Sequence, residues 1–493
     1  MLGMTEKKIL QLIYKVSKAS KIDVYIVGGY VRDQILNKKG VNRAPQPYTT
    51  RVHGKGYTAG DMDFVVLGSG LEFAKLFDKE MSDSGGSLVE FPDFDTARYV
   101  LEGYEIEFAG ARSEKYDEKS RKPAVKPATL EQDLSRRDFT INAMARKVEA
   151  RGLGKIVDPY GGQKDIKKKV LKTPLDPDIT FFDDPLRMMR AARFASQLGF
   201  SIDKGVLEAI VRNGKRLKII SAERIKEELF KLLATEKPSV GLWILYGTRL
   251  LDQFLPEVSD LSGVEEVKGY SHKDNLSHSF AVVDNIAQWS DKTLLRFAGL
   301  LHDIAKTQTK KFVRGRGWTF DMHEHLGKKM VYDISKRLKL SKDEGKYVGK
   351  LVRWHLQPIA LMDEGITDSP VRRLVVNLQE DLDDLLILCR GDITTGNQDK
   401  KVKRLKNYDK LEKRIAEVLE KDKLRAFQSP VRGEEIMELC GLKPGPTVGK
   451  IKEEIERAIL DGEIPNDYEK AKKYFEKIKP KFLAEAEDWE KKL

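Results

Sequence analysis

The segment VYIVGGYVRDQIL, residues 24–36, constrains the fold of this chain more than any other short stretch. It begins with a β-branched run typical of a strand and continues through a glycine pair into residues that favour a helix. Two further strands are predicted at DMDFVVLGSG (61–70) and YEIEFAGAR (104–112), with the helix-forming LEFAKLFDKEM (71–81) between them. Residues 1–150 are therefore predicted to form a small mixed α/β domain.

The remainder of the sequence has helical patterns and is too long to share one core. At 493 residues, the chain is expected to form three or four domains. The last hundred residues are predicted to be Lys/Glu-rich helices interrupted by GLKPGPTVG (441–449). Four parts are predicted, namely a head, a helical neck, a histidine-bearing helical domain and a helical tail: 1–150, 151–265, 266–400 and 401–493.

Charge and cysteine content narrow the class of partner. The formal net charge is +12 and the pI about 9.2, which suits a polyanion such as nucleic acid. Only two cysteines are present, Cys389 and Cys440, which argues against a disulfide framework and a cysteine-based zinc site. No apolar run approaches the roughly 18 residues of a membrane span, and the start MLGMTEKKIL lacks a signal-peptide core. We therefore expect a cytoplasmic protein without membrane contact.

An aspartate pair on the second predicted strand indicates a metal site. Asp61 and Asp63 alternate in DMDF, so both carboxylates lie on one face. Such carboxylates repel each other unless a cation lies between them, and Mg²⁺ prefers these oxygen ligands. An acidic pair alone is usually structural, but Gly28 and Gly29 upstream allow close approach to a phosphate that Arg32 can neutralise. Together these residues predict a two-metal site for attack on an α-phosphate.

A third carboxylate is needed to complete such a site. Glu107 on the strand EIEF is the candidate. Glu105 points the same way, because it lies two residues earlier on the same strand. The choice between them stays open from the sequence.

The segment FDDPLRMMRAARF (182–194) predicts a helix from about Pro185, because proline is tolerated in a first turn and most other residues are helix formers. One side of this helix is apolar, with Met188, Ala192 and Ala195. The other carries a charged stripe: Asp184, Arg187, Arg190 and Arg193. Such a stripe is ordinarily a solvated face, and the alternative is that it binds a ligand.

Four motifs in a fixed order resolve this choice. They are VGGYVRD…DMDFVV, RRDFTINAMA (136–145), DDPLRMMRAARF and ERIKEELFKLL (223–233). Together they resemble the bacterial-type (class II) tRNA nucleotidyltransferase and poly(A) polymerase family. GLKPGPTVG followed by KIKEEIERAILDGEIPN is similar to the C-terminal part of CCA-adding members. The resemblance implies an α/β nucleotidyltransferase head of the polymerase-β-like type, followed by an all-α neck, an HD-type helical domain and a helical tail.

The resemblance also implies roles for individual residues. Asp61 and Asp63 would bind Mg²⁺ ions that activate the RNA 3′-hydroxyl and steady the leaving pyrophosphate. The glycine pair and Arg32 would hold the triphosphate, while Arg137 and Asp138 would contact the nucleotide and its ribose. The expected partners are tRNA, with CTP and ATP as substrates, and no protein partner is implied. The basic tail, including Lys443, Lys450 and the amides around Gly445 and Gly449, is expected to bind tRNA.

Base selection would then depend on Asp184 and Arg187. Cytosine and adenine present an amino donor beside a ring-nitrogen acceptor, whereas uracil and guanine present a carbonyl and a ring N–H. Asp184 can accept from the amino group and Arg187 can donate to the ring nitrogen. The wrong bases would leave buried polar groups unpaired, at roughly 1–3 kcal/mol each. In the family this helix serves as a protein template, and the later arginines, here Arg190 and Arg193, also contact the nucleotide.

Two departures from the family pattern are evident. Asp183 stands where the family usually has glutamate, which puts a contact that needs the longer side chain in doubt. The stretch NKKGVNRAPQPYTTRVHGKGYTAG (37–60) is long for the family. Because it is basic and rich in turn residues, we expect a surface insertion that either contacts RNA phosphates or is idle.

A second metal site is predicted from histidines clustered in residues 278–355. The pattern of an adjacent His and Asp, flanked by further histidines and a late aspartate, resembles an HD-type metal-dependent phosphohydrolase domain. Imidazole and carboxylate together suit divalent transition metals. His323 matches the family's H-E-x-x-G pattern better than His325, and Lys306 is a candidate for binding substrate phosphate. The six candidate ligands are His278, His302, Asp303, His323, His355 and Asp392.

The first interpretation is a CCA-adding tRNA nucleotidyltransferase with an HD domain. Two alternatives stay open for that domain: a phosphohydrolase activity, which would repair damaged RNA 3′ ends, and metal binding without turnover. A poly(A) polymerase on the same scaffold is the nearest alternative, and the HD domain and the tail favour the CCA enzyme. Addition of CC only or A only stays open. A different class is an RNA-binding HD phosphohydrolase with an inactive head, against which the complete set of head motifs argues.

Overall fold

The computed structural model describes residues 5–37, 60–81, 85–101, 103–117, 120–264, 266–267, 270–271, 274–362, 367–422 and 429–486. The chain divides into two compact units, Met1–Ser259 and Asp260–Leu493. The predicted basic insertion lies, apart from its ends, outside the described residues. Among the described helices, none combines the length and apolar character needed to span a membrane.

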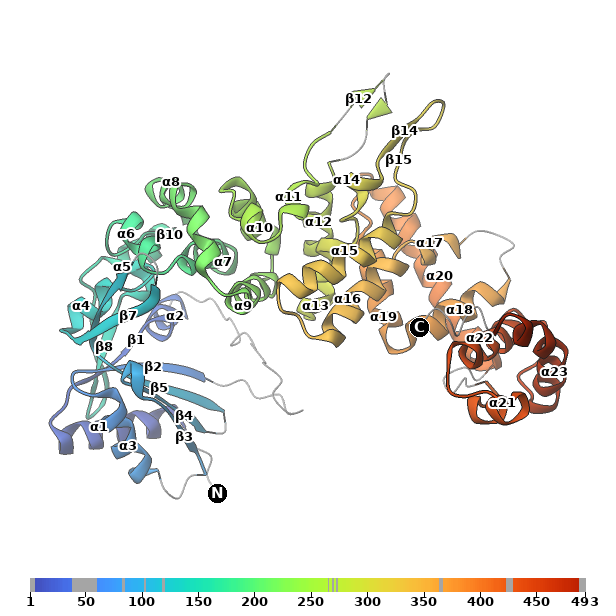
Figure 1. The fold of residues 1–493 in the computed structure, drawn as a ribbon. Helices are drawn as coiled ribbons and strands as arrows, with labels where there is room; N and C mark the ends of the chain where they lie inside the picture. Colours follow the sequence, from blue (N-terminus) through green and yellow to red (C-terminus); the bar gives the residue numbers. More distant parts are fainter. Residues whose placement is uncertain are drawn as a thin grey trace. The chain divides into compact units, whose positions relative to one another are not determined.

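A seven-stranded mixed sheet forms the centre of the first unit (Figure 1). Its order is β3-β4-β5-β2-β1-β8-β9, with β2 parallel to β5 and the other neighbours antiparallel. The strands are β1 (Val24–Val27), β2 (Gly60–Val66), β3 (Ser87–Phe91), β4 (Thr96–Leu101), β5 (Tyr104–Gly110), β8 (Ala145–Glu149) and β9 (Gly152–Val157); β6 (Arg112–Asp117) and β7 (Ser120–Pro127) form a separate hairpin. The predicted mixed α/β head is confirmed.

The predicted strands correspond to β1, β2 and β5, and the predicted helices to α2 (Gly29–Asn37) and α3 (Gly70–Glu80). Strands β3, β4, β8 and β9 were not predicted, because short strands that alternate apolar and charged residues give a weak local signal. Strand β9 pairs with β8, so the sheet continues past residue 150, where the predicted head ends.

The two faces of the sheet differ in chemistry. Phe64 of β2 and Phe108 of β5 stack with centroids 5.5 Å apart. Helix α3 covers this face, with Phe73 and Phe77 each 5.2 Å from the ring of Phe108, and packs beside α1 (Glu6–Ser20) (Figure 1). Because side chains alternate along a strand, the acidic residues of β2 and β5 point to the opposite face. Burial of the aromatic side chains therefore fixes where the acidic face lies.

Helices follow the sheet in the same unit. They are α4 (Leu130–Ser135), α5 (Gly162–Lys168), α6 (Pro177–Asp183), α7 (Leu186–Leu198), α8 (Lys204–Asn213), α9 (Ala222–Leu233), α10 (Pro238–Gly247) and α11 (Pro256–Ser259), with the short parallel pair β10 (Val170–Leu171) and β11 (Ser201–Ile202). Helix α7 packs against α9 and α10, and its apolar side, including Met188 and Ala192, is fully buried.

The second unit begins with a helical bundle. Its helices are α12 (Asn275–Ala287), α13 (Thr293–Leu301), α14 (Lys306–Thr309), α15 (His323–Arg337), α16 (Lys342–Trp354), α17 (Gln357–Ala360), α18 (Asp368–Leu378), α19 (Leu382–Gly391) and α20 (Gln398–Asp422). Two strand pairs that were not predicted accompany the bundle. The pair β12 (Glu266–Val267) and β13 (Tyr270–Ser271) precedes α12, and the pair β14 (Lys311–Val313) and β15 (Gly317–Thr319) lies between α14 and α15.

The tail is a small helical assembly with its own core. Helices α21 (Gly433–Cys440), α22 (Pro446–Leu460) and α23 (Tyr468–Ala484) bury Ile436, Ile451 and Phe475 together. The predicted break at GLKPGPTVG is confirmed, because Gly441 ends α21 at φ +65° and Gly445 caps α22, with Pro446 in its first turn. Lys443 and Lys450 are exposed there, and tRNA binding by the tail stays a prediction.

Candidate functional site

Strands β2 and β5 bring the predicted head carboxylates side by side. In the parallel register Asp63 lies opposite Glu107, and Asp61 opposite Glu105. Registered neighbours share a face, so the backbone directs the side chains of Asp63, Glu105 and Glu107 to the acidic face. The side chain of Asp61 lies outside the described residues, and that of Asp63 is exposed. The register thus supplies a third carboxylate beside each aspartate.

Arg98 of β4 contacts both candidates for the third carboxylate. Its guanidinium lies 3.2 Å from Glu107 and 3.6 Å from Glu105. Both glutamates are about equally exposed, at 37% and 41%, so burial does not separate them. Glu107 is the one next to Asp63, and it remains the preferred candidate.

The glycine pair makes room for charged side chains. Gly28 has φ +72°, and a Cβ there would lie 3.3 Å from Nη1 of Arg137 and 3.7 Å from Oδ2 of Asp63. A Cβ on Gly29 would lie 3.3 Å from Nη2 of Arg32. Gly28 therefore meets both a backbone and a steric requirement that only glycine satisfies. The structure brings predicted phosphate-binding and metal-binding residues together around this turn.

Asp138 links these residues to helix α7. It is buried, and its Oδ1 accepts from the Phe139 amide at 2.8 Å and from Asn142 at 3.0 Å. Its Oδ2 accepts from Arg190 at 2.7 Å. Burial alone raises the pKa of Asp138, but the Arg190 guanidinium and the Asn142 amide outweigh it and lower the pKa to about 2. Asp138 is therefore ionised and saturated with donors.

Asn142 extends this chain of contacts back to the glycine pair. Its side-chain oxygen accepts from Arg32 at 2.8 Å. Arg32, Arg190 and Arg193 all approach the ring of Phe194, with guanidinium carbons 5.3, 5.3 and 4.0 Å from its centroid. Sequence reasoning did not single out Asn142 or Phe194, although Asn142 lies within RRDFTINAMA.

The charged stripe on α7 is not a solvated face. Arg187 and Arg193 are only 9% and 7% exposed. Arg187 donates to the Thr180 carbonyl at 3.3 Å, while Arg193 pairs with Glu228 of α9 and donates to Gln197 at 2.7 Å. Arg193 is thus tied to the interior of the neck, which makes it a support for α7 rather than an exposed ligand contact.

Asp184 does not lie on helix α7, where its place in the stripe put it. It caps the end of α6 with φ −137° and ψ 100°. Pro185 follows, and the residue before proline is excluded from the helical region by steric contact with the ring. In this extended conformation Oδ1 of Asp184 accepts from the Leu186 amide at 3.1 Å, so the side chain is held against the first turn of α7.

Arg224 of α9 is a site residue that sequence reasoning missed. Its Nη2 lies 3.0 Å from Oδ2 of Asp184. The pair is partly exposed, at 41% for Arg224 and 22% for Asp184. Arg224 lies within the motif ERIKEELFKLL, which was identified in the sequence, but its contact with Asp184 was not predicted. It orients the carboxylate that is predicted to accept from a base.

The second candidate site is built from helix ends in the bundle of the second unit. His278 lies in the first turn of α12, and His323 begins α15. Three helices instead end at the site, α13 at His302, α16 at His355 and α19 at Asp392. Helix C-termini carry partial negative charge, so their convergence favours a cation.

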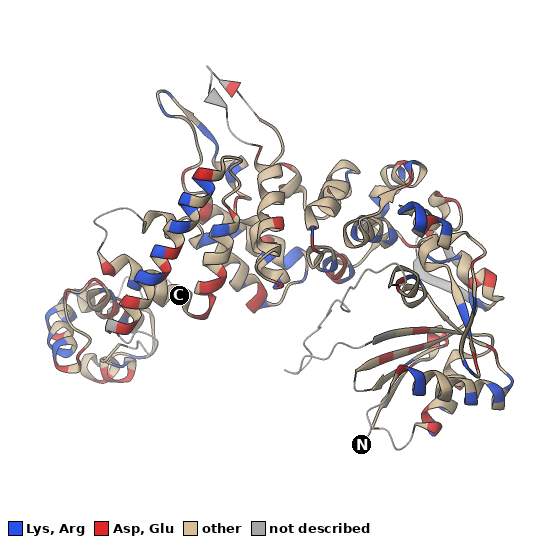
Figure 2. Ribbon diagram, turned by 180° about the vertical axis from the view of Figure 1, so that it is seen from behind, with Lys and Arg blue, Asp and Glu red and all other residues tan. Residues whose placement is uncertain are grey.

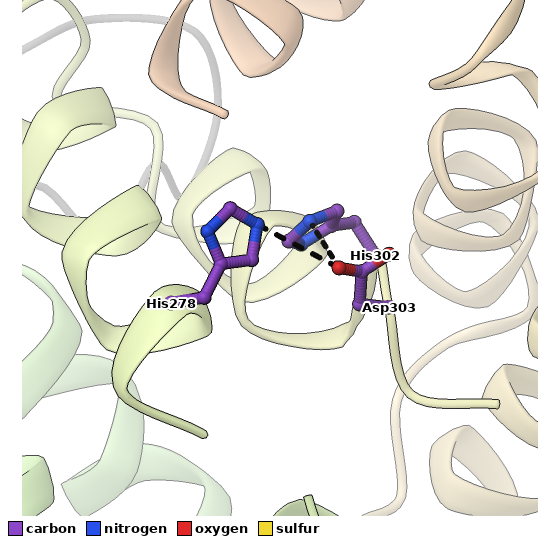
Figure 3. Close-up of side chains that lie close together, drawn as sticks. All are labelled: His278, His302 and Asp303. Carbon is purple, nitrogen blue, oxygen red and sulfur yellow. Dashed lines mark ion pairs between the residues drawn. The ribbon is translucent and has the colours of Figure 1, made fainter. Parts of the chain in front are cut away.

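Asp303 lies at the centre of this site. Its Oδ2 is 3.2 Å from Nε2 of His302 and 3.6 Å from that of His278, which point toward it (Figure 3). Its Oδ1 is 3.3 Å from Nε2 of His323 and 3.7 Å from that of His355. Five of the six predicted ligands form two groups that share Asp303, namely His278, His302 and Asp303, and Asp303, His323 and His355. The sixth, Asp392, lies beside the first group, 2.8 Å from Nε2 of His278.

Hydrogen bonds behind the imidazoles aim their Nε2 atoms inward. The Nδ1 atoms of His302, His323 and His355 lie 2.7–2.8 Å from the carbonyls of Gly299, Phe320 and Val352. That of His278 lies 2.8 Å from the Thr394 hydroxyl, a contact that sequence reasoning missed. A carbonyl can only accept, so Nδ1 of His302, His323 and His355 carries a proton, and Nε2 is the atom directed toward the carboxylates.

These Nε2 atoms face carboxylate oxygens, which favour a positive charge beside them, either a proton or a metal ion. Among the described residues, no hydrogen-bond partner lies at the buried Nε2 of His302. Burial by itself lowers the pKa of His302, but Asp303 and Asp392 raise it to about 10. Burial and the neighbouring His302 lower that of His355 to about 4. The nitrogen and carboxylate donors fit divalent metal ions, which the two groups around Asp303 would hold.

Two further residues lie at the edge of this site. Lys306 pairs with Oδ2 of Asp303 at 2.6 Å, so a cation already lies where a phosphate would bind. His325 is exposed and lies 3.7 Å from Glu324, outside both ligand groups. The preference for His323 over His325 agrees with this geometry.

The two histidines provide a matched pair of variants. We expect His323→Ala to weaken the binding of Co²⁺ more than tenfold, because it removes a ligand atom rather than an outer hydrogen bond. His325→Ala should retain the wild-type metal content. The measurement is cobalt per chain after equilibrium dialysis, and wild-type content in His323→Ala would contradict the assignment.

Comparisons with known proteins place these sites in a family. Models of the poly A polymerase head domain, the probable RNA- and SrmB-binding site of polymerase A, and the HD domain match residues 24–172, 199–261 and 275–413. The A-adding tRNA nucleotidyltransferase of Deinococcus radiodurans is 33% identical over 352 residues, 69% of this chain and 77% of that protein. The multifunctional CCA protein of Stenotrophomonas maltophilia is 33% identical over 365 residues, 71% and 80% of the two chains.

A solved structure shows the same fold. The crystal structure of the Bacillus stearothermophilus CCA-adding enzyme in complex with CTP aligns over 97% of this chain and 99% of its own, with a TM-score of 0.64 and 23% identity. The order of motifs, the convergence of the head residues and the similarity to curated relatives agree. The chain belongs to the tRNA nucleotidyltransferase and poly(A) polymerase family, as a member that carries an HD domain.

Proposed function

We propose that this protein is a CCA-adding tRNA nucleotidyltransferase that adds C, C and A to the tRNA 3′ end from CTP and ATP. The observation that carries the proposal is that Asp63 borders the turn at Gly28, while hydrogen bonds join Arg32 in the helix that follows this turn through Asn142 and Asp138 to Arg190 of helix α7. It supports a single site in which phosphate-binding and base-reading residues act on one nucleotide. Action on tRNA is consistent with a cytoplasmic location.

The acidic face suits Mg²⁺. Asp61, Asp63 and Glu107 would hold the ions, a role supported by the strand register, in which Asp63 lies opposite Glu107. The chemistry that Mg²⁺ supplies when bound is activation of the RNA 3′-hydroxyl and neutralisation of the pyrophosphate. The 3′-oxygen bonds to the α-phosphorus while the bond to pyrophosphate breaks. Arg32 and Arg137, beside the glycine turn, would balance the triphosphate charge and orient the α-phosphate.

Base recognition would use the start of α7. Oδ2 of Asp184 would accept from the amino group of cytosine or adenine, and Arg187 would donate to the ring nitrogen. Arg224 would hold the direction of this carboxylate through their 3.0 Å ion pair, which makes it a positioning residue. Arg190 and Arg193 would support α7 through Asp138 and Glu228.

Three alternatives act on the same scaffold. The Deinococcus radiodurans relative is named an A-adding enzyme, so addition of A alone has specific support, and CC-only addition and poly(A) synthesis complete the set. The HD domain and the tail favour tRNA as the substrate. An inactive head is disfavoured by the complete cluster around Gly28 and Asp138.

We further propose that the HD domain is a transition-metal-dependent phosphohydrolase for RNA 3′ ends. The support is the buried pair of ligand groups around Asp303, with Lys306 beside them. The chemistry that the metals supply when bound is activation of water. In hydrolysis of a 2′,3′-cyclic phosphate, water adds to phosphorus, one P–O bond to the ribose breaks and the departing oxygen takes a proton.

Incubation with tRNA that ends at the discriminator base separates the alternatives. Wild type should add two nucleotides with CTP alone, none with ATP alone and three with both. Asp63→Asn should abolish addition but retain tRNA binding, because it removes a metal ligand and no RNA contact.

Glu107→Gln should also abolish addition, whereas Glu105→Gln serves as the matched control and should remain active. Product lengths on a sequencing gel give the result. Addition with ATP alone on this acceptor would overturn CCA synthesis, and full activity of Asp63→Asn would overturn the metal site.

Asp184 and Arg187 should determine which nucleotide is added. In Asp184→Ala or Arg187→Ala, the ratio of kcat/KM for CTP to that for UTP should fall roughly 5- to 150-fold, since each contact is worth about 1–3 kcal/mol. Arg224→Ala should lower the ratio less, because Arg224 acts through Asp184.

Arg212→Ala is the control for Arg224→Ala, since it breaks an exposed ion pair with Asp178 in the same helical region. Its ratio should match wild type. A CTP-to-UTP ratio within a factor of two of wild type in both Asp184→Ala and Arg187→Ala would refute the template role.

Hydrolysis by the HD domain should require an added transition metal. Wild type loaded with Co²⁺ should open a 2′,3′-cyclic phosphate on an RNA 3′ end, and His302→Ala should not, while its nucleotide addition persists. Release of a monoester end, measured by chromatography, is the readout. Absence of hydrolysis with every divalent metal tried would leave the centre a structural role only.

A further inference from the structure

The hairpin of β14 and β15 is a basic projection that the proposed chemistry leaves unused. It lies between the two metal-binding segments in sequence and extends from the bundle of the second unit (Figures 1 and 2). Residues 304–320 contain five basic side chains and no acidic one. The basic residues are Lys306, Lys310, Lys311, Arg314 and Arg316.

Three cations of the hairpin, Lys311 at its base and Arg314 and Arg316 at its tip, are exposed. None of the three makes an ion pair with any part of the chain that the structure describes. Elsewhere in the same unit, Lys292, Lys350 and Arg373 each pair with an aspartate. Clustered cations without acidic neighbours attract a polyanion, because phosphates can replace released counterions.

Aromatic side chains accompany these cations. Phe312 and Trp318 are cross-strand partners with ring centroids 5.4 Å apart. Lys310 lies over the Trp318 ring at 4.4 Å. Both rings are partly exposed. Basic and aromatic side chains together are typical of surfaces that bind single-stranded nucleic acid, where the cations contact phosphates and the rings stack on bases.

The base of the hairpin contacts the metal-binding site directly. The Phe320 carbonyl accepts from Nδ1 of His323 at 2.7 Å, and the Phe320 ring lies 5.6 Å from Nζ of Lys306. Lys306 in turn pairs with Asp303, the residue that the two ligand groups share. From Phe320 to Arg316 the strand spans about 13 Å. A polyanion bound along the hairpin would therefore extend to the metal-ligating residues of the HD domain.

From this continuity we propose that the β14–β15 hairpin binds the phosphates of a single-stranded RNA end and directs its 3′-terminal phosphate to the HD centre. The proposal rests on the hydrolase activity proposed above and specifies its substrate class as polynucleotide ends. A mononucleotide with its phosphate between Lys306 and Asp303 does not extend to Arg314 and Arg316, whereas an RNA strand of several nucleotides does.

The test compares two substrates with the same reacting group. These are a short oligoribonucleotide ending in a 2′,3′-cyclic phosphate and the corresponding cyclic mononucleotide, both with the Co²⁺-loaded full chain. Wild type should prefer the oligonucleotide in kcat/KM. The double variant Arg314→Ala/Arg316→Ala should lower this preference about tenfold. The slope of log KM against log salt should become shallower by about 1.4, since each single-strand phosphate contact contributes about 0.7.

Lys336→Ala/Lys342→Ala is the matched control. It removes two exposed cations at the opposite ends of α15 and α16 from His323 and His355, about 20 Å away along each helix. Its substrate preference should equal that of wild type. Equal use of both substrates by wild type, or a preference unchanged in the hairpin variant, would overturn the proposal and leave the hydrolase intact.

Ultraviolet crosslinking of the same oligonucleotide tests the surface without turnover. Mass spectrometry should find the crosslink on residues 310–318 in wild type and lose it in the hairpin variant. If this crosslink forms but no substrate is hydrolysed, the RNA surface stands and the hydrolase fails. If oligonucleotide is hydrolysed while the crosslink lies only elsewhere, the hairpin proposal fails.

Discussion

The buried carboxylate of Asp138 is the contact on which the nucleotide site depends. Its oxygens accept hydrogen bonds from Arg190 of α7 and from the side-chain amide of Asn142. The side-chain oxygen of Asn142 in turn accepts a hydrogen bond from Arg32, beside the glycine turn. A buried charge is stable only when its hydrogen-bonding capacity is filled, and removal of one partner leaves the other uncompensated. The depressed pKa of Asp138 shows that its partners favour the ionised form. One carboxylate thus sets the distance between the phosphate-binding and base-reading residues.

The candidate site of the second unit has a different arrangement of ionisable groups. Four imidazole Nε2 atoms and two carboxylates face one another, because hydrogen bonds at Nδ1 orient the rings. The carboxylates favour positive charge between these groups, as protons or as metal ions. Three helix C-termini add to the negative potential. Both sites therefore concentrate negative charge, yet oxygen ligands in the head and nitrogen ligands in the bundle suit different metals.

Each site lies entirely within one of the two units, so the residues of each can be altered with little effect on the other. Within the first unit, the glycine turn, α7 and α9 are connected by side-chain contacts. Arg224 and Glu228 of α9 form ion pairs with Asp184 and Arg193. The motif ERIKEELFKLL is in this sense a support for the template. Specificity for the base would then depend on residues that never contact it.

The sequence by itself determined the mixed α/β head, the helical remainder and the family, and it identified the six candidate ligands of the bundle, because these follow from local patterns and motif order. It did not determine which face of the sheet is acidic, which partner each carboxylate has, or that Asp184 lies off helix α7. Those depend on strand register, on burial of Phe64 and Phe108, and on the restriction that Pro185 imposes in its packed context. The hairpin of β14 and β15 was likewise unpredicted, because its strands are too short to show a period. Contacts between residues distant in sequence decided these features, and only the tertiary structure contains them.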